Sequence, residues 1–230
     1  MLHLPDVTLV VVAGDYIRTT EAALRDIEER FLFGGVLELD AAPTFEAVSE
    51  VMQFEVAPRL QTSHALFIQW DGYPTDPEMW SDEFLGYDYI GAVWPWFTDN
   101  SVGNGGFSLR SRRLLDLLAG MPRVDYPEDI SICRQLRPLL EDRDILFAPE
   151  PVAERFSREH WPVGAKTFGF HGVWNMLDFM DDGAVVKRLT LLEPKQWRQQ
   201  YMTYVSAFAL RQGRRDLFLW VQNMIGRHKE

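Results

Sequence analysis

At 230 residues, with 47% hydrophobic and 25% charged residues, the chain has the length and composition of one globular α/β domain with a small appendage, which excludes disordered and fibrous proteins. The net charge of -11 argues against a nucleic-acid-binding protein, because phosphate contacts need clustered Lys and Arg. No apolar run reaches the roughly 18 residues that span a bilayer. Since the first residues lack the basic region of a secretory signal and Cys133 is the single cysteine, we expect a cytoplasmic protein.

The charge is distributed unevenly along the chain. Residues 186–230 carry nine basic and three acidic residues, whereas the preceding 185 carry 14 basic and 31 acidic ones. We therefore expect two parts, an acidic body at 1–185 and a basic C-terminal extension at 186–230.

Hydrophobic patterning predicts alternating strands and helices in the first third of the chain. Strands are expected at 7–12, 36–39 and 64–70, and helices from Thr19 or Thr20 to about residue 31 and over about 44–59. Such alternation favours an α/β sheet with helices on both faces, in which ligands gather beyond the carboxyl ends of the strands. Asp15, Asp40 and Asp71 each stand at such an end.

The remainder of the chain continues the mixed pattern. Strands are expected at about 88–93, 105–110 and 144–148, and helices at about 111–119 and 128–140. The residues after 194 look helical throughout. Together these predictions describe a single α/β domain followed by a helical C-terminal extension.

Four motifs contain residues that could carry chemistry, and each also has a purely structural explanation. Asp71, which ends a strand before a glycine, can reach a divalent cation held on a diphosphate, or it can simply initiate a turn. The glycine-rich loop at 102–106 allows close approach of a ligand, or forms a tight turn before a hairpin; it matches neither the Walker loop nor the dinucleotide fingerprint. Glu128 and Asp129 offer a general base, or stabilise the start of a helix. His171, between glycines and aromatics, can complete a metal site begun by Asp71, or serve a structural role.

Two indoles, Trp94 and Trp96, flank a proline just before the glycine-rich loop. Aromatic faces can pack on the C–H faces of sugar rings, and core packing is the alternative. Because two indoles around a proline are awkward to bury together, we favour a sugar contact.

The order of these motifs resembles the GT-A superfamily of glycosyltransferases, whose shared elements are a DxD motif, a glycine-rich loop, an xED motif and a C-terminal metal-binding His. The chain is also similar, over about residues 7–175, to a bacterial family of domains of unknown function. That family is marked by QWDG, DYIGA-W-PW, GNGGFSLRSRRLL, PED and FGFHG, which stand here at 69–72, 88–96, 103–115, 127–129 and 168–172. The resemblance implies a GT-A-like, Rossmann-like fold with a mixed central sheet flanked by helices.

The resemblance also implies roles for individual residues. Asp71 matches the last acid of DxD, which holds Mn²⁺ or Mg²⁺ on the donor diphosphate. Gln69 stands where DxD has its first acid, and it would contact the nucleotide-sugar donor. Asp129 matches the catalytic base of inverting members, Glu128 would orient the acceptor or its neighbour, and His171 matches the C-terminal metal ligand. The resemblance further implies that Asp15 and Asp40 contact the nucleotide and that Tyr16 stacks on its base. Contacts with the donor or acceptor sugar are implied for Trp94, Trp96, Asn104, Gly105 and Gly106.

The function that we expect is transfer of a sugar from a nucleotide-diphosphate sugar, UDP-linked by preference, to a glycan or lipid-linked glycan. A non-catalytic carbohydrate-binding or scaffolding protein on the same fold is the alternative, because an acid of DxD is missing. A nucleotidyltransferase ranks third, because no basic phosphate-binding loop follows the first strand. The aromatic and basic residues after 194 suit peripheral contact with the inner face of the membrane, and a cap on the domain or a dimer contact explains them equally well.

Overall fold

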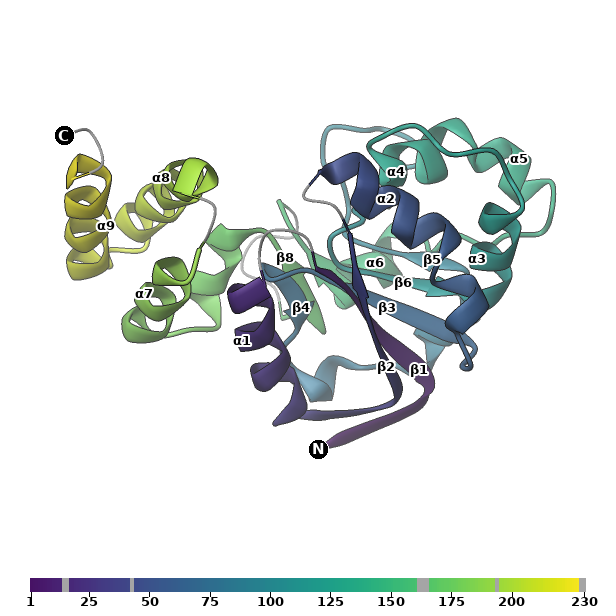
Figure 1. Cartoon of the computed structure of the whole chain (residues 1–230), viewed down its shortest axis with the longest axis horizontal. Coiled ribbons are helices and arrows are strands. Elements are labelled where there is room, and N and C mark those ends of the chain that lie inside the picture. Colours follow the sequence, from purple (N-terminus) through teal and green to yellow (C-terminus); the bar gives the residue numbers. More distant parts are fainter. Residues whose placement is uncertain (14–16, 42–43, 161–165, 193–194, 228–230) are drawn as a thin grey trace.

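The computed structural model describes residues 1–13, 17–41, 44–160, 166–192 and 195–227. Its main feature is a mixed five-stranded sheet with helices on both faces, in the strand order β2-β1-β3-β6-β5 (Figure 1). The strands of this sheet are β1 (Leu2–Ala13), β2 (Phe31–Asp40), β3 (His64–Ile68), β5 (Tyr89–Ile90) and β6 (Ser108–Ser111). β2, β1 and β3 are parallel, whereas β6 is antiparallel to β3 and β5 is antiparallel to β6. The predicted α/β class, with a mixed sheet flanked by helices, is confirmed.

Alternation along the central strands divides the core between the two faces of the sheet. Leu9 and Leu66 pack in the cluster that contains the buried face of α1, whereas Val10 and Phe67 pack in the cluster that contains residues of α2 and α3. Successive side chains of a strand point to opposite faces, so the apolar runs in β1 and β3 bury both faces of the sheet. The helices concerned are α1 (Ile17–Glu28), α2 (Phe45–Phe54) and α3 (Arg112–Ala119).

Side-chain caps fix where two of these helices begin. The hydroxyl of Thr44 accepts the N–H of Ala47 at the start of α2, and that of Ser111 accepts the N–H of Leu114 at the start of α3. Beyond α2, the predicted helix ends in a separate 3₁₀ turn at Ala57–Arg59.

Several predicted boundaries differ from the structure. α1 spans Ile17–Glu28, so Thr19 and Thr20 lie inside the helix and do not start it, and β2 begins at Phe31, five residues before the predicted strand. The strands predicted at 88–93 and 105–110 are reduced to β5 and β6. The predicted helix at 128–140 is divided into α4 (Glu128–Ile130), a π-helical stretch at Ser131–Gln135 and α5 (Arg137–Glu141); Pro138 lacks an N–H and starts a new helix. The predicted strand at 144–148 is wrong: within the described chain it is reduced to an isolated bridge between Tyr89 and Phe147.

A second sheet of three very short strands stands beside the first. Its strands are β4 (Gly72–Pro74), β7 (Ser157–Arg158) and β8 (Gly169–His171), in the order β4-β8-β7. β4 follows β3 after one tight turn and is antiparallel to β8, while β7 is parallel to β8. This small sheet joins two segments that are far apart in the sequence, and α6 (Glu150–Phe156) leads directly into it.

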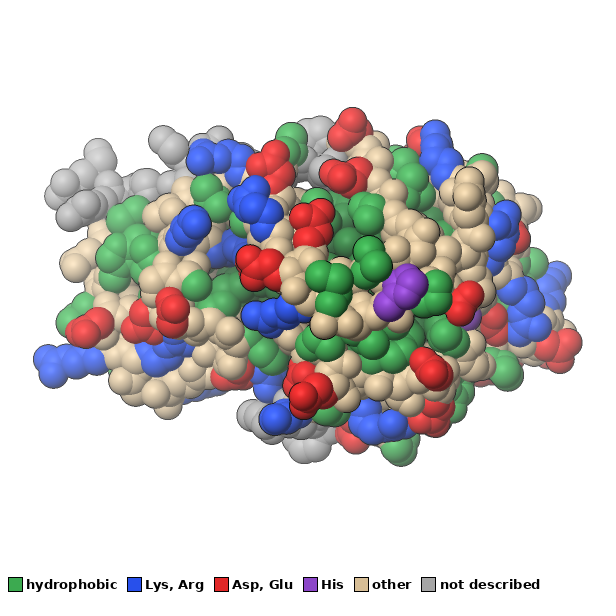
Figure 2. Space-filling view, turned by 90° about the horizontal axis from the view of Figure 1, so that it is seen from below, with side chains coloured by type: hydrophobic (Ala, Val, Ile, Leu, Met, Phe, Trp, Pro, Cys, Tyr) green, Lys and Arg blue, Asp and Glu red, His purple; other side chains and the backbone are tan. Residues whose placement is uncertain are grey.

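The C-terminal helices lie at one end of the molecule, beyond α1 (Figure 1). They are α7 (Asp182–Thr190), α8 (Lys195–Arg211) and α9 (Arg215–Arg227). Met202 and Val205 of α8 and Val221 of α9 are buried in the same cluster as Leu9 and Leu66 of the main sheet, and the predicted division of the chain after residue 185 falls inside α7. Among the described residues, each helix is too short or too polar to cross a membrane. Acidic and basic side chains are interspersed over the face seen in Figure 2.

Candidate functional site

The small sheet brings Asp71 and His171 together. β3 leads into a tight turn in which the N–H of Gln69 donates to the carbonyl of Gly72 at 2.8 Å and the N–H of Gly72 donates back at 3.0 Å. Gly72 then pairs with His171 across β4 and β8. As a result, Nε2 of His171 lies 3.9 Å from Oδ1 of Asp71 and 3.2 Å from Oε1 of Gln69. We call the residues around this imidazole the candidate site: Gln69, Asp71, Asn104, Asp129, Glu159 and His171.

The other ring nitrogen of His171 contacts a carboxylate. Nδ1 lies 3.0 Å from Oε1 of Glu159. The parallel pairing of β7 with β8 aligns Arg158 with Phe170, so the next residues along, Glu159 and His171, lie side by side. A carboxylate on Nδ1 fixes the orientation of the ring and leaves Nε2 facing Asp71.

The charges around His171 shift its protonation. Burial by itself lowers the pKa of His171, but the carboxylates of Glu159, Asp71 and Asp129 outweigh burial and raise the pKa to about 9. Burial raises the pKa of Asp71, and His171 lowers it in part. For Glu159 burial is outweighed by the hydrogen bond and charge of His171, so that its pKa is lowered. Without a metal, the imidazole is therefore protonated at neutral pH, and a cation that binds Nε2 would have to displace the proton from that nitrogen.

The glycine-rich loop packs directly on this imidazole. Asn104 has φ of 71°, a left-handed conformation that Asn tolerates better than most residues. Its Oδ1 accepts the N–H groups of Gly106 at 3.1 Å and Phe107 at 3.3 Å, so its Nδ2 points outward and lies 3.0 Å from Nδ1 of His171. A Cβ on Gly106 would overlap the imidazole ring, which explains why a glycine stands there.

Glu128 is buried and neutralised. Its Oε1 accepts the guanidinium of Arg110 at 3.0 Å, and its Oε2 accepts the hydroxyl of Ser49 at 3.3 Å. Arg110 is 1% exposed and lies over the rings of Phe67 and Tyr89. Because both Glu128 oxygens are held in this way, the residue is suited to positioning α4 and not to proton transfer.

Asp129 is the carboxylate that faces the loop. Its Oδ2 accepts the N–H of Gly105 at 2.9 Å, and its Oδ1 accepts the N–H of Ile130 at 2.8 Å. Burial and the charge of Glu128 raise the pKa of Asp129, while the two backbone hydrogen bonds oppose that rise. A Cβ on Gly105 would overlap the Glu128 carboxylate, so the loop, Glu128 and Asp129 form one tightly packed unit.

The two indoles differ in their surroundings. Trp94 is 4% exposed, and its ring packs against the backbone of Gly103. The buried indole supports the loop instead of offering a face to a ligand, so the predicted pair of sugar-stacking indoles is reduced to Trp96. Trp96 is 56% exposed, and its ring centre lies 5.2 Å from that of His160, which stacks on Trp174 at 4.9 Å. We call Trp96, His160 and Trp174 the aromatic row.

The residues predicted to contact the nucleotide are Asp15, Tyr16 and Asp40. Asp15 and Tyr16 fall outside the described residues. Asp40 is exposed at the carboxyl end of β2, where it pairs in register with Ala13 of β1. Because β1, β2 and β3 are parallel, this end of β2 lies at the same edge of the sheet as the turn that carries Asp71.

Two residues were not predicted from the sequence: Glu159 of the candidate site, and Arg110, which pairs with Glu128. Arg110 lies inside the GNGGFSLRS motif, so the motif itself was an available signal. Glu159 follows a strand of only two residues and lies outside every quoted motif. Its contact with His171 depends on strand pairing, and the local sequence carries no signal for it.

The donor atoms around Nε2 suit a divalent cation that is shared with a ligand. Asp71 Oδ1, Gln69 Oε1 and His171 Nε2 are the oxygen and nitrogen donors that Mn²⁺ and Mg²⁺ accept, with Glu159 behind the imidazole as in many metal sites. Within the described part of the chain, no three His, Cys, Asp or Glu side chains converge on one metal position. A cation held by Asp71, Gln69 and His171 would need further oxygen ligands to reach the six that Mg²⁺ prefers.

A family model described as "Protein of unknown function (DUF5672)" matches residues 43–171, which is more than half of the chain. The matched segment includes Gln69, Asp71, the glycine-rich loop, Asp129 and Glu159, and it ends at His171. No curated protein matches the chain. The predicted membership of a family of unknown function is confirmed, and this chain belongs to the DUF5672 family.

Proposed function

We propose that this protein is a GT-A-like glycosyltransferase. It would transfer a sugar from a nucleotide-diphosphate sugar, UDP-linked by preference, to a hydroxyl of a glycan or lipid-linked glycan. The observation that carries the proposal is the gathering of Asp71, His171 and Asp129 around one glycine-rich loop. The mixed sheet, with β2, β1 and β3 parallel and β6 antiparallel, supports the GT-A-like part of the proposal.

The donor diphosphate would bind on the Asp71 side of the site. Asp71, His171 and Gln69 would hold Mn²⁺ or Mg²⁺, which as a Lewis acid stabilises the negative charge of a leaving diphosphate. Glu159 holds the ring of His171 in its orientation. Gln69 supplies a neutral oxygen where the DxD motif has a carboxylate, so we expect weaker metal affinity than a site with two acids would have.

Asp129 would act as the catalytic base on the acceptor side. Each of its oxygens accepts one backbone N–H and keeps a second lone pair for an acceptor hydroxyl. In the transfer, the proton of the acceptor hydroxyl passes to Asp129 while the acceptor oxygen forms a bond to the anomeric carbon. The bond from that carbon to the diphosphate oxygen breaks, and the nucleoside diphosphate leaves on the opposite side, with inversion. The raised pKa of Asp129 supports this role because it increases the affinity of the carboxylate for the proton.

Glu128 would be a positioning residue and not a second base. Arg110 neutralises it, and the pair fixes the start of α4, from which Asp129 reaches the loop. The exposed Trp96 at the end of the aromatic row offers a flat apolar surface for an acceptor sugar.

Transfer assays with Asp129→Asn test the proposal. Purified protein is incubated with Mn²⁺ and a panel of UDP- and GDP-sugars, and release of the nucleoside diphosphate is measured. We expect turnover of at least one donor, and a loss of about 10²–10⁴-fold in Asp129→Asn, because general base catalysis contributes that much. Asp125→Asn is the matched control, since Asp125 is exposed and its backbone carbonyl, not its carboxylate, accepts the hydroxyl of Ser131. Equal rates for wild type and Asp129→Asn would remove the base from the proposal.

A carbohydrate-binding protein without catalysis is the second candidate. It is favoured by the neutral Gln69 at the first DxD position and by the exposed indole of Trp96. Calorimetric titration with UDP, with and without Mn²⁺, separates the two functions. A glycosyltransferase binds UDP more tightly with the metal, whereas a binding protein takes up oligosaccharide and shows no metal-dependent affinity for UDP.

A further inference from the structure

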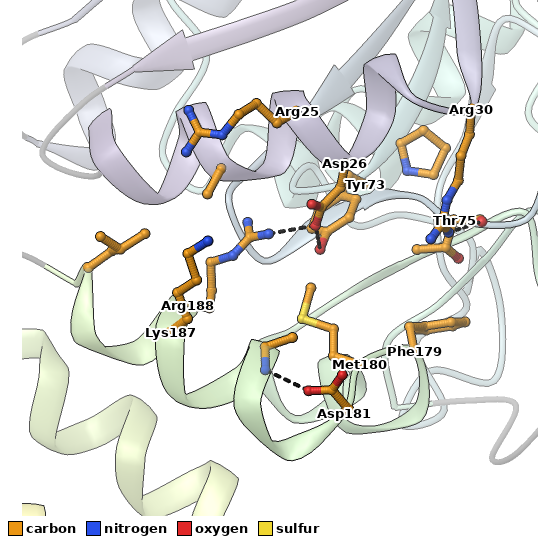
Figure 3. Close-up of a pocket in the computed structure, with 14 residues that line it drawn as sticks. Arg25, Asp26, Arg30, Tyr73, Thr75, Phe179, Met180, Asp181, Lys187 and Arg188 are labelled. Atoms are coloured by element: carbon orange, nitrogen blue, oxygen red, sulfur yellow. Dashed lines mark hydrogen bonds and ion pairs between the residues drawn. The ribbon is translucent and has the colours of Figure 1, made fainter.

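A cavity of about 290 Å³ lies between α1 and α7, with β4 and the residues before α7 at its back (Figure 3). None of its lining residues belongs to the candidate site. The two sites are nevertheless neighbours along β4, since Gly72 packs on His171 and the next residue, Tyr73, lines the cavity.

Basic side chains dominate the charge of this cavity. Two aspartates line the cavity, Asp26 and Asp181. Four cationic residues line it: Arg25, Arg30, Lys187 and Arg188. Both aspartates already have partners. Asp26 accepts the guanidinium of Arg188 at 2.6 Å and the hydroxyl of Tyr73 at 3.3 Å, and Asp181 accepts the N–H of Ala184 at 2.8 Å at the start of α7.

Two of the cations remain available for a ligand. Arg25 extends from α1 and Lys187 from α7, on facing sides of the cavity (Figure 3). Among the described residues, neither side chain has an ion pair or a hydrogen bond, and both are exposed. Arg30 donates one N–H to the carbonyl of Thr75 at 2.8 Å and keeps further donors, because a guanidinium has five.

The back of the cavity is formed by buried polar residues. Tyr73 is 1% exposed, Arg188 is 5% exposed and Thr75 is 8% exposed. Because Arg188 is already paired with Asp26, the charge that is available to a ligand comes from the exposed cations in front of this wall.

We propose that this cavity is a binding site for a small molecule that carries a phosphate group. Phosphate is favoured over carboxylate because two uncommitted cations face the cavity, and a phosphomonoester carries about -1.5 to -2 charges at pH 7. Arg25 and Lys187 pair with the charge, and Arg30 donates to a phosphate oxygen. The proposal does not depend on the glycosyltransferase activity.

Calorimetric titrations with inorganic phosphate, glucose 6-phosphate and glucose test the site. EDTA is present, so that metal-dependent binding at the candidate site does not contribute, and Asp71→Ala serves as a second check on that point. We expect saturable binding of both phosphate probes, no binding of glucose, and unchanged affinities in Asp71→Ala. Binding of inorganic phosphate without glucose 6-phosphate identifies the free ion as the ligand, whereas binding of both identifies a phosphorylated molecule.

Two variants locate the binding. Arg25→Ala/Lys187→Ala weakens phosphate binding about tenfold or more, while Arg18→Ala/Arg215→Ala, which removes two exposed cations elsewhere, leaves it unchanged. The proposal is overturned if inorganic phosphate shows no saturable binding at millimolar concentration, if glucose binds as well as its phosphate, or if Arg25→Ala/Lys187→Ala binds like wild type.

Discussion

Nε2 of His171 lies 3.9 Å from Oδ1 of Asp71, across the pairing of β4 with β8. Neither strand exceeds three residues, and both belong to the small sheet beside the main one. The glycine-rich loop closes over the same imidazole, and Asp129 is hydrogen-bonded to that loop. The candidate site therefore depends on the backbone geometry of a few residues, which the following predictions test.

Gly106→Ala should disrupt the site from the loop side. A Cβ at this position overlaps the imidazole of His171, so the ring or the loop must move. We expect a loss of about 1–3 kcal/mol in the free energy of unfolding and weaker binding of UDP in the presence of Mn²⁺. The measurements are denaturant unfolding and calorimetry.

Gly86→Ala is the control for that substitution. Gly86 has open space where its Cβ would lie, and it is exposed. It should leave both the stability and the affinity for UDP close to wild type. If Gly106→Ala behaves like Gly86→Ala, the packing of the loop on His171 has no functional importance.

Glu159→Gln should weaken metal-dependent binding without unfolding the protein. The substitution keeps the size of the side chain but removes the charge on the partner of Nδ1, which orients the ring of His171. Loss of such a partner lowers metal affinity about 10–100-fold. Titration of the protein with UDP and Mn²⁺ measures the change, and Glu78→Gln, an exposed acid, is the control. Equal Mn²⁺ dependence in both variants would argue against a metal at His171.

Asp88→Asn should lower stability in a pH-dependent way. Burial raises the pKa of Asp88, but hydrogen bonds from Arg113, Ser111 and the N–H of Leu146 outweigh burial and lower it below the ordinary 3.8. A lowered carboxyl pKa stabilises the fold above the pKa of the unfolded state, and that contribution is lost as the pH falls through the folded value.

The expected cost of Asp88→Asn is about 1–3 kcal/mol of unfolding free energy at pH 6, because hydrogen bonds to a charged group are lost. Denaturant unfolding at pH 6 and pH 3 should give a smaller difference from wild type at pH 3. Asp116→Asn, whose carboxylate is exposed in an i,i+4 pair with Arg112, should change stability by less than about 0.5 kcal/mol. A difference that is equal at both pH values would contradict the electrostatic explanation.

The predicted membrane contact is best tested by reversing charge on the surface of the C-terminal helices. Deleting the helices would remove Met202, Val205 and Val221, which are buried in the core cluster that includes the main sheet, and would expose the apolar side chains that they cover. Arg211 and Arg215 are exposed. If these helices bind anionic lipid, Arg211→Glu/Arg215→Glu should weaken co-sedimentation with phosphatidylglycerol vesicles about tenfold or more, since each basic residue contributes about 1 kcal/mol. Neutral phosphatidylcholine vesicles are the control, and unchanged sedimentation would leave the helices as a cap on the domain or as a dimer contact.

The central sheet could be predicted from the sequence because its signals are local. The apolar runs in β1 and β3 lie within the strands that they define, and the capping hydroxyls of Thr44 and Ser111 stand directly before the helices α2 and α3. The small sheet could not be predicted, because strands of two or three residues have no measurable periodicity. Pro138 was a local signal for the break between α4 and α5, and the uninterrupted helix predicted there was wrong.

For the candidate site, the sequence identified residue types but not their contacts. Asp71, Asp129 and His171 each had a structural explanation when considered alone, and the resemblance to known motifs supplied their grouping. Glu159 had no motif, since its position beside His171 follows from the register of β7 against β8. The burial of Trp94 under the loop likewise depends on a contact with Gly103 that local hydrophobicity does not reveal.

The most direct measurement is the position of manganese in crystals grown with UDP and Mn²⁺, located by anomalous diffraction. Metal-assisted sugar transfer predicts a manganese peak within about 2.0–2.3 Å of Asp71 Oδ1 and His171 Nε2, with the UDP diphosphate completing its coordination. Clear density for UDP with manganese absent from these two atoms, or bound to other residues, would contradict it.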